Sequence, residues 1–150
     1  VSIAHEKLAP LIGHPEGIAL TNNGYQLMIE CDAALATSGT VNLELALRQV
    51  PTVVVYRLSL FNAFMAGVIL RLKLPHYSLP NIVAGKTVFP ELMHTDFTVE
   101  RAKECLLPFL TDTNARQTCL KECQQIREKL FSPNPSKLAA EKILALLKGK

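Results

Sequence analysis

The sequence has no tryptophan, and only 6% of its residues are aromatic. Aromatic residues do not alternate with basic ones along any predicted strand, which is the pattern that stacks the bases of single-stranded nucleic acids. The charge is also nearly balanced, because 16 basic and 13 acidic residues leave a formal net charge of +3. That excess permits an anionic ligand or a membrane surface without requiring nucleic acid. We therefore expect no nucleic-acid partner.

Patterns typical of metal sites are missing as well. The four cysteines include no CxxC pair, and the four histidines form no HxxxH or HExxH pattern. Cys119 and Cys123 are one helical turn apart and could share a face, but a metal site would need two further ligands beside them. We expect no metal and no other cofactor, and reduced thiols as is usual in the cytoplasm.

The amino terminus lacks the apolar segment of a signal peptide. His5, Glu6 and Pro10 interrupt its first apolar residues. The first residue is Val1 rather than methionine, which favours a domain cut from a longer protein. The 150 residues fit one domain in length, and 49% of them are hydrophobic, enough for a buried core.

Residues 17–56 alternate short apolar runs with turn residues and helical periodicity. The predicted order is strand, helix, strand, helix, strand, with these segments: Gly17–Leu20, a short helix from the turn at 21–24 through Met28, Asp32–Ala36, Val41–Gln49 and Thr52–Tyr56. The β-branched run in the last segment is typical of a buried parallel strand. The alternation predicts an α/β fold with a Rossmann-like, doubly wound parallel sheet and flanking helices.

The second half of the chain is predicted to be mainly helical. We expect a short strand at Tyr77–Ser78, a functional loop over 81–97, and three helices at about 98–109, 113–131 and 135–148. This division predicts a Rossmann-like domain over 1–110. Carboxy-terminal helices over 111–150 would pack on that domain or on a partner.

Leu58–Leu70 is nearly all apolar and has Arg57, Arg71 and Lys73 at its ends. It is too short to span a bilayer, which needs about 20 residues. Two interpretations stay open. The segment is either a helix buried on several sides or an interfacial helix that dips into lipid with basic residues at its rim.

The turn Ser38-Gly39-Thr40 lies between a predicted strand and the amino end of a predicted helix. In an open parallel sheet, ligands bind at the carboxyl ends of the strands. A glycine there lets the backbone approach a ligand, and the first N–H groups of the helix favour an anion such as a diphosphate. The alternative is a plain helix cap formed by Ser38 or Thr40.

Glu44 follows Thr40 by one helical turn and lies on the same side of the helix, while Leu43 and Leu47 are predicted to face the core. A capping box would place the acid three residues after the cap, at Leu43 if Thr40 is the cap. Glu44 therefore has two interpretations: a carboxylate that accepts both hydroxyls of a ribose, or a solvated acid near a helix start.

Tyr56 and Arg57 end the strongest predicted strand, at the ligand-facing edge of the sheet. Arg57 could neutralise phosphate through a bidentate contact. The alternative is an arginine that pairs with a neighbouring acid at the strand exit.

Several ordered blocks together resemble the lipid-A-disaccharide synthase family. They are SGTVNLELALRQVPTVVVYR over Ser38–Arg57 and YSLPNIVAGKTVFPELMH over Tyr77–His94. The resemblance covers roughly residues 31–94 well, and beyond them the helical tail matches in character more than in letters. Where the family usually has glutamine shortly after Pro-Glu-Leu, this chain has His94, which can titrate.

The resemblance implies one half of a two-domain GT-B fold, the carboxy-terminal half that holds UDP. Such enzymes transfer a diacylglucosamine unit from UDP-2,3-diacylglucosamine to 2,3-diacylglucosamine-1-phosphate, lipid X, and need no metal. The missing amino-terminal domain would supply the acceptor site and the catalytic base, so no catalytic residue is assigned in this chain. The resemblance further implies a cytoplasmic enzyme of lipid A biosynthesis, peripheral on the inner membrane, and the helical tail suggests a homodimer.

Nine residues would line the donor site by this resemblance. The glycine turn would meet the diphosphate or the nearby sugar, Glu44 the ribose, and an asparagine would reach the ligand from the loop that Gly85 shapes. The full set is Ser38, Gly39, Thr40, Glu44, Tyr56, Arg57, Asn81, Gly85 and Glu91.

Two alternatives remain at this stage. The chain could be the nucleotide-sugar-binding module of a split glycosyltransferase that pairs with another polypeptide. It could also come from another GT-B enzyme that uses UDP-GlcNAc, although the Ser-Leu-Pro-Asn and Ala-Gly blocks speak against that. The isolated chain is expected to be inactive in either case.

Overall fold

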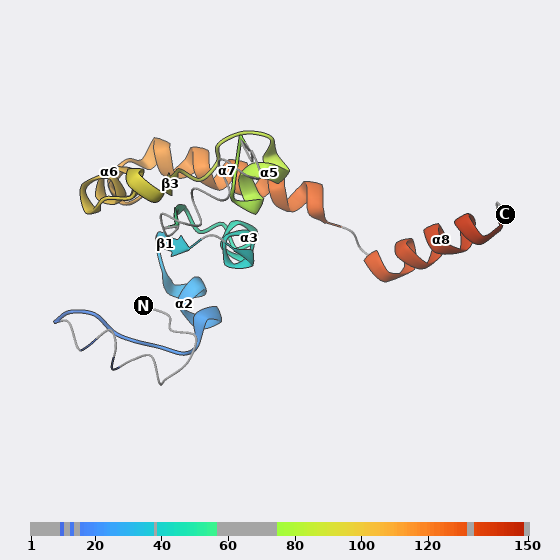
Figure 1. The fold of residues 1–150 in the computed structure, drawn as a ribbon, viewed down its shortest axis with the longest axis horizontal. Helices are drawn as coiled ribbons and strands as arrows, with labels where there is room; N and C mark the ends of the chain where they lie inside the picture. Colours follow the sequence, from blue (N-terminus) through green and yellow to red (C-terminus); the bar gives the residue numbers. More distant parts are fainter. Residues whose placement is uncertain are drawn as a thin grey trace.

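A computed structural model describes residues 10, 13, 16–37, 39–56, 75–131 and 134–148. Its centre is a three-stranded parallel sheet in the order β1-β2-β3, flanked by helices (Figure 1). The strands are β1 (Ala34–Thr37), β2 (Thr52–Tyr56) and β3 (Glu91–Met93). This architecture confirms the predicted α/β class with a Rossmann-like parallel sheet.

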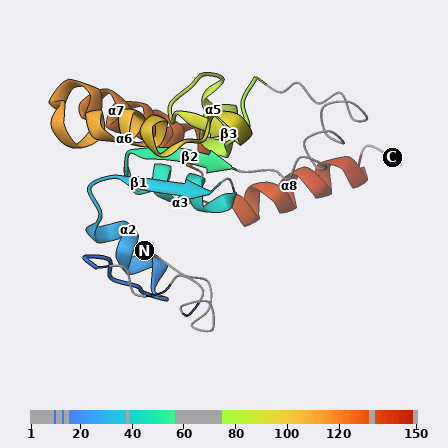
Figure 2. The same cartoon turned by 60° about the vertical axis from the view of Figure 1, so that its left-hand side comes forward.

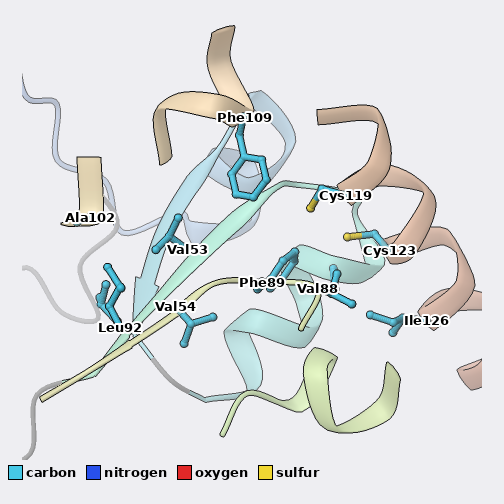
Figure 3. Packing of buried hydrophobic residues seen from close by; sticks show 12 residues of the cluster. Val53, Val54, Val88, Phe89, Leu92, Ala102, Phe109, Cys119, Cys123 and Ile126 are labelled. Carbon is cyan, nitrogen blue, oxygen red and sulfur yellow. The ribbon is translucent and has the colours of Figure 1, made fainter. Parts of the chain in front are cut away.

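The middle strand, β2, has the bounds that its β-branched residues predict. Its first four residues are buried, and Val53 and Val54 have no exposed surface. Val53 lies on the side of Ala102 and Phe109, whereas Val54 points to the other side of the sheet (Figure 3). The strand is apolar on both faces because helices cover both faces.

Helix α2 (Gly24–Glu30) begins where the turn residues predict. The side chain of Asn23 accepts a hydrogen bond from the N–H of Gln26 and so caps the helix. The predicted strand at Gly17–Leu20 is wrong, because residues 18–20 adopt no strand. Gly17 has a φ of +76° and Ile18 is 47% exposed, so this short apolar run follows a turn and is not packed into a sheet.

Two helices cover one side of the strands and a third covers the other (Figure 1). They are α3 (Thr40–Leu47) and α5 (Leu79–Ala84) on one side, and α6 (Val99–Thr111) on the other. The most buried residues of α3 are Asn42, Leu45 and Ala46, whereas the predicted core residues Leu43 and Leu47 are only half-buried. The buried stripe differs because α3 packs on α5 and α7 as well as on the strands.

Helix α7 (Thr113–Leu130) runs across the amino ends of the strands. Arg116 Nη1 donates to the carbonyl of Asp32, just before β1, at 2.6 Å. Gln49, just before β2, donates through Nε2 to Gln124 Oε1, also at 2.6 Å. Glu122 also forms an ion pair with Lys86, which follows α5. One helix therefore braces the edge of the sheet opposite to the strand ends (Figure 2).

The cysteines of α7 confirm the expectation of a shared face. Cys119 and Cys123 are both free thiols buried in the core (Figure 3). The hydrogen bond from Cys123 lowers the pKa of Cys119, and the same bond together with burial raises the pKa of Cys123. Cys123 therefore stays protonated inside the core.

The segment between residues 75 and 97 departs most from the sequence prediction. Tyr77–Ser78 is not a strand but the approach to α5, whose first turn contains Pro80. The segment 81–97 is also not a loop as predicted, since it contains most of α5, strand β3 and the 3₁₀ turn η3 (His94–Asp96), and its functional role stays a prediction. The predicted apolar helix after β2 lies outside the described residues, as do Ser38 and Arg57.

The three helices at the carboxy terminus are confirmed to within two residues. The last, α8 (Pro135–Lys148), stands apart from the sheet (Figure 1). All of residues 134–147 are exposed, including these large apolar side chains: Leu138, Ile143, Leu144, Leu146 and Leu147. Among the described residues, no helix has the length and apolarity needed to cross a bilayer.

Gly85 ends α5 in the left-handed conformation, with φ +72° and ψ +17°, and its N–H donates to the carbonyl of Asn81. We expect Gly85→Ala to lower the free energy of unfolding by about 1–2 kcal/mol, the cost of a left-handed backbone with a Cβ. A Cβ at Gly85 would meet no atom within 4 Å, so the cost is conformational and not steric crowding. Urea denaturation measures the change.

The matched control is Gly24→Ala at the first position of α2. Gly24 is helical and is not among the glycines with positive φ. Alanine should be neutral or slightly stabilising there. Equal losses in both variants would contradict the assignment of strain to Gly85.

Candidate functional site: the carboxyl edge of the sheet

The carboxyl ends of the three strands lie level with one another. Thr37, the last residue of β1, is in register with Val55, and Tyr56, the last residue of β2, is in register with Met93. Tyr56 is 38% exposed although the rest of β2 is buried. The strands therefore emerge together on one open edge, which is where parallel α/β sheets bind ligands.

Gly39 forms the turn between β1 and α3 on this edge. It is the N-cap of α3, with φ +154° and ψ −167°, a conformation open almost only to glycine. Thr40 is the first helical residue, so it does not cap the helix. No acidic residue lies in the first turn to offset the positive end of the helix dipole. The geometry suits an anion held by backbone N–H groups.

Glu44 lies one turn further along α3 and is half-buried. It is on the same side of the helix as Thr40, four residues earlier. The structure thus places Gly39, Thr40 and Tyr56 at the same edge of the sheet, with Glu44 one helical turn into α3 from that edge.

The remaining described candidates lie elsewhere, in a cluster between α5 and β3. The Asn81 side chain is fully buried and hydrogen-bonded to the backbone of Val88 and Phe89. The Glu91 carboxylate accepts the N–H groups of Tyr77 and Ser78. Gly85 shapes the turn after α5. The donor-site role of these residues stays a prediction.

Sequence reasoning missed Asn42, which is fully buried in the first half of α3. Among the residues that the structure describes, neither its amide nitrogen nor its amide oxygen has a hydrogen-bond partner. It shares its buried face with Leu45 and Ala46, three and four residues on. That spacing could have identified a polar side chain on the core-facing side of the helix.

A cleft of about 860 Å³ lies away from the strand ends, between α2, the end of α3 and α7. Arg48 and Arg116 line it, together with Glu30 and Asp32. The guanidinium of Arg48 also stacks over the ring of Tyr25 at 5.4 Å from its centroid. None of the predicted donor-site residues lines this cleft, so it is separate from the carboxyl edge.

A parallel sheet with an open carboxyl edge and a glycine turn at a helix start is typical of Rossmann-like α/β units. Comparison with known proteins is more specific. A family model described as lipid-A-disaccharide synthetase matches residues 10–144. This chain therefore belongs to the lipid-A-disaccharide synthase family, as the ordered sequence blocks predict.

Individual relatives support the same family membership. The chain is 38% identical over 122 residues to the lipid-A-disaccharide synthase of Prochlorococcus marinus (strain MIT 9313), covering 81% of this chain and 31% of that protein. It is 37% identical over 131 residues to the synthase of Nitrosococcus oceani, covering 87% and 33%. For the Chlamydia felis synthase the identity is 38% over 110 residues, covering 72% and 17%. The chain spans about a third of the length of the first two relatives.

Proposed function

We propose that this chain is the donor-binding half of a lipid-A-disaccharide synthase and holds the UDP part of UDP-2,3-diacylglucosamine. The observation that carries the proposal is the Gly39 turn at the amino end of α3, placed on the open carboxyl edge of the sheet. Membership of the family supports the same ligand class.

In this proposal the diphosphate binds at the amino end of α3. The N–H groups of the first helical turn would meet an anion there, and the Gly39 turn leaves room for close approach, since no atom of the described residues lies within 4 Å of the position a Cβ would take. Glu44 accepts the ribose hydroxyls one helical turn away, and the exposed Tyr56 lines the neighbouring strand end. Ser38 and Arg57 are proposed for the same site on the sequence blocks alone.

The complete reaction needs more than this chain. We propose that a further domain supplies the acceptor site for lipid X and the base that activates its hydroxyl. That domain would then act with this chain to transfer the diacylglucosamine unit and release UDP. The exposed apolar side chains of α8 favour binding of this helix to another protein surface or to a second copy of the chain. No metal is part of the proposal, because the helix terminus and Arg57 would balance the diphosphate charge.

The test is the affinity of the chain for UDP. We expect Glu44→Ala to weaken binding by about 1–3 kcal/mol, the range for removing a charged hydrogen-bond acceptor. Titration calorimetry at millimolar UDP measures the affinity of both proteins. The effect should be specific to UDP over free pyrophosphate, because Glu44 is proposed to contact the ribose.

Glu128→Ala is the matched control, since Glu128 is an exposed acid on α7, the helix that lies across the opposite edge of the sheet. Its loss should leave UDP affinity unchanged. The proposal fails if the unaltered chain shows no UDP binding, or if Glu44→Ala binds UDP as tightly as the unaltered chain does.

A further inference from the structure

Asn81 links α5 to the residues that precede β3. Its Oδ1 accepts the N–H of Val88 at 2.8 Å and that of Phe89 at 2.9 Å, and its Nδ2 donates to the carbonyl of Phe89 at 2.8 Å. The side chain has no exposed surface. Three backbone groups beside the core residue Phe89 thus depend on one amide for their hydrogen bonds.

Glu91 makes the reciprocal link from β3 to the start of α5. Its Oε1 accepts the N–H of Ser78 at 2.7 Å, and both carboxylate oxygens lie within 3.2 Å of the N–H nitrogen of Tyr77. Ser78 is the N-cap residue of α5, but its own side chain makes no capping bond. An acid from another element thus stabilises the positive end of this short helix.

The two links connect α5 to the central strand of the sheet through β3. Between them, the carbonyl of Pro90 accepts the N–H of Val54 on the central strand at 2.8 Å. Glu91 and Leu92 are in register with Val54 and Val55, and β3 ends beside Tyr56 at Met93. The position of the third strand end on the carboxyl edge is therefore coupled to the bonds of Asn81 and Glu91.

The backbone after β3 is also constrained. His94 has a φ of +50°, a left-handed conformation that is uncommon for residues other than glycine. Such a conformation persists only where the surrounding structure enforces it. His94 directly follows β3, so this constrained conformation lies at the edge where the donor is proposed to bind.

We propose that Asn81 and Glu91 are positioning residues that lock α5 and β3 together and do not contact the donor. This inference rests on the proposed function, since the strand end that they place borders the proposed donor site. In this proposal two sequence blocks hold each other in place through hydrogen bonds. They are Ser78-Leu79-Pro80-Asn81 and Pro90-Glu91-Leu92. Their polar side chains are occupied by backbone groups of this chain, so a ligand would have to displace these bonds to reach them.

The test uses the full 150-residue chain and two variants at Glu91. Glu91→Gln keeps an Oε1 that can accept both N–H groups, whereas Glu91→Ala keeps neither acceptor. Hydrogen exchange followed by NMR reports the amides of Tyr77 and Ser78 without UDP, and calorimetry reports UDP affinity. Glu104→Ala, an exposed acid on α6, is the control.

We expect exchange at Tyr77 and Ser78 to rise about tenfold in Glu91→Ala, the scale of one lost hydrogen bond. UDP affinity should fall about threefold to tenfold, within the range for residues that act without touching the ligand. Glu91→Gln should restore most of both quantities. Asn81→Ala should raise exchange at Val88 and Phe89 in the same way.

Three other results would overturn the inference. Weaker UDP binding in Glu91→Ala with unchanged exchange would show direct donor contact. Faster exchange with unchanged UDP affinity would show a role confined to the fold. Absence of UDP binding by the unaltered chain would overturn the proposed function and the positioning role with it, while the exchange data alone would still decide whether the lock exists.

Discussion

Replacement of Phe89 by alanine is expected to lower the free energy of unfolding by about 3–5 kcal/mol, the usual cost of truncating a buried aromatic side chain. Phe89 has no exposed surface and belongs to the hydrophobic core in which β2 and α7 meet (Figure 3). Alanine would leave a cavity that the braced sheet cannot close. Denaturant unfolding followed by circular dichroism measures the loss.

Phe131→Ala is the matched control for this prediction. Phe131 follows α7 and is 71% exposed, so its truncation removes little buried area. We expect a change of less than about 0.5 kcal/mol, as for most surface substitutions. Similar losses in the two variants would show that the core is not centred on Phe89.

Gly39→Val is expected to weaken UDP binding by about 3 kcal/mol, at the upper end of the cost of a strained backbone conformation. The φ of +154° and ψ of −167° at Gly39 are poorly accessible to a β-branched residue. Valine would therefore shift the turn and redirect the first N–H groups of α3. Titration calorimetry with UDP measures the loss of affinity, and thermal unfolding shows whether the fold persists.

Gly17→Val is the control that separates the effect of backbone strain on stability from the effect of the Gly39 turn on UDP binding. Gly17 also has a positive φ, +76°, and a Cβ there would meet no atom within 4 Å, but it precedes α2 and is not at a strand end. The substitution should cost stability without changing UDP affinity. If both variants lose affinity alike, the turn at Gly39 has no special part in binding.

The fold was most predictable where the residues of a segment alone indicate its secondary structure. The β-branched run of β2 gave the exact strand bounds. The helices α6, α7 and α8 were recovered because each is at least thirteen residues long and has polar or proline residues at its start.

Shorter elements escaped prediction because neighbours create them. Strand β3 has only three residues and exists through pairing with β2. Helix α5 has six residues, and its start is held by Glu91, thirteen and fourteen positions further along the chain. Such long-range bonds cannot be seen in local periodicity.

The candidate site also divides into residues that local patterns locate and residues whose surroundings depend on long-range contacts. The glycine turn and Glu44 could be located from sequence, because strand–turn–helix order and helical spacing are local properties. Asn81 and Glu91 were assigned to the donor site from the family resemblance, and local sequence could not show their partners, which are backbone groups seven to fourteen residues away. Asn42 was overlooked because Leu43 and Leu47 were taken as the core-facing residues of α3, whereas the buried face carries Asn42, Leu45 and Ala46.

The brace formed by α7 has a mechanical consequence. Because its side chains are bonded to residues before β1 and β2, and the carbonyl before β3 is bonded to Val54 of β2, one strand cannot slide along the next without breaking several bonds in different places at once. The three strand ends on the other edge must then move as a rigid block. Any opening or closing of this half over a bound nucleotide would be a hinge motion of the whole unit, not a rearrangement within its sheet.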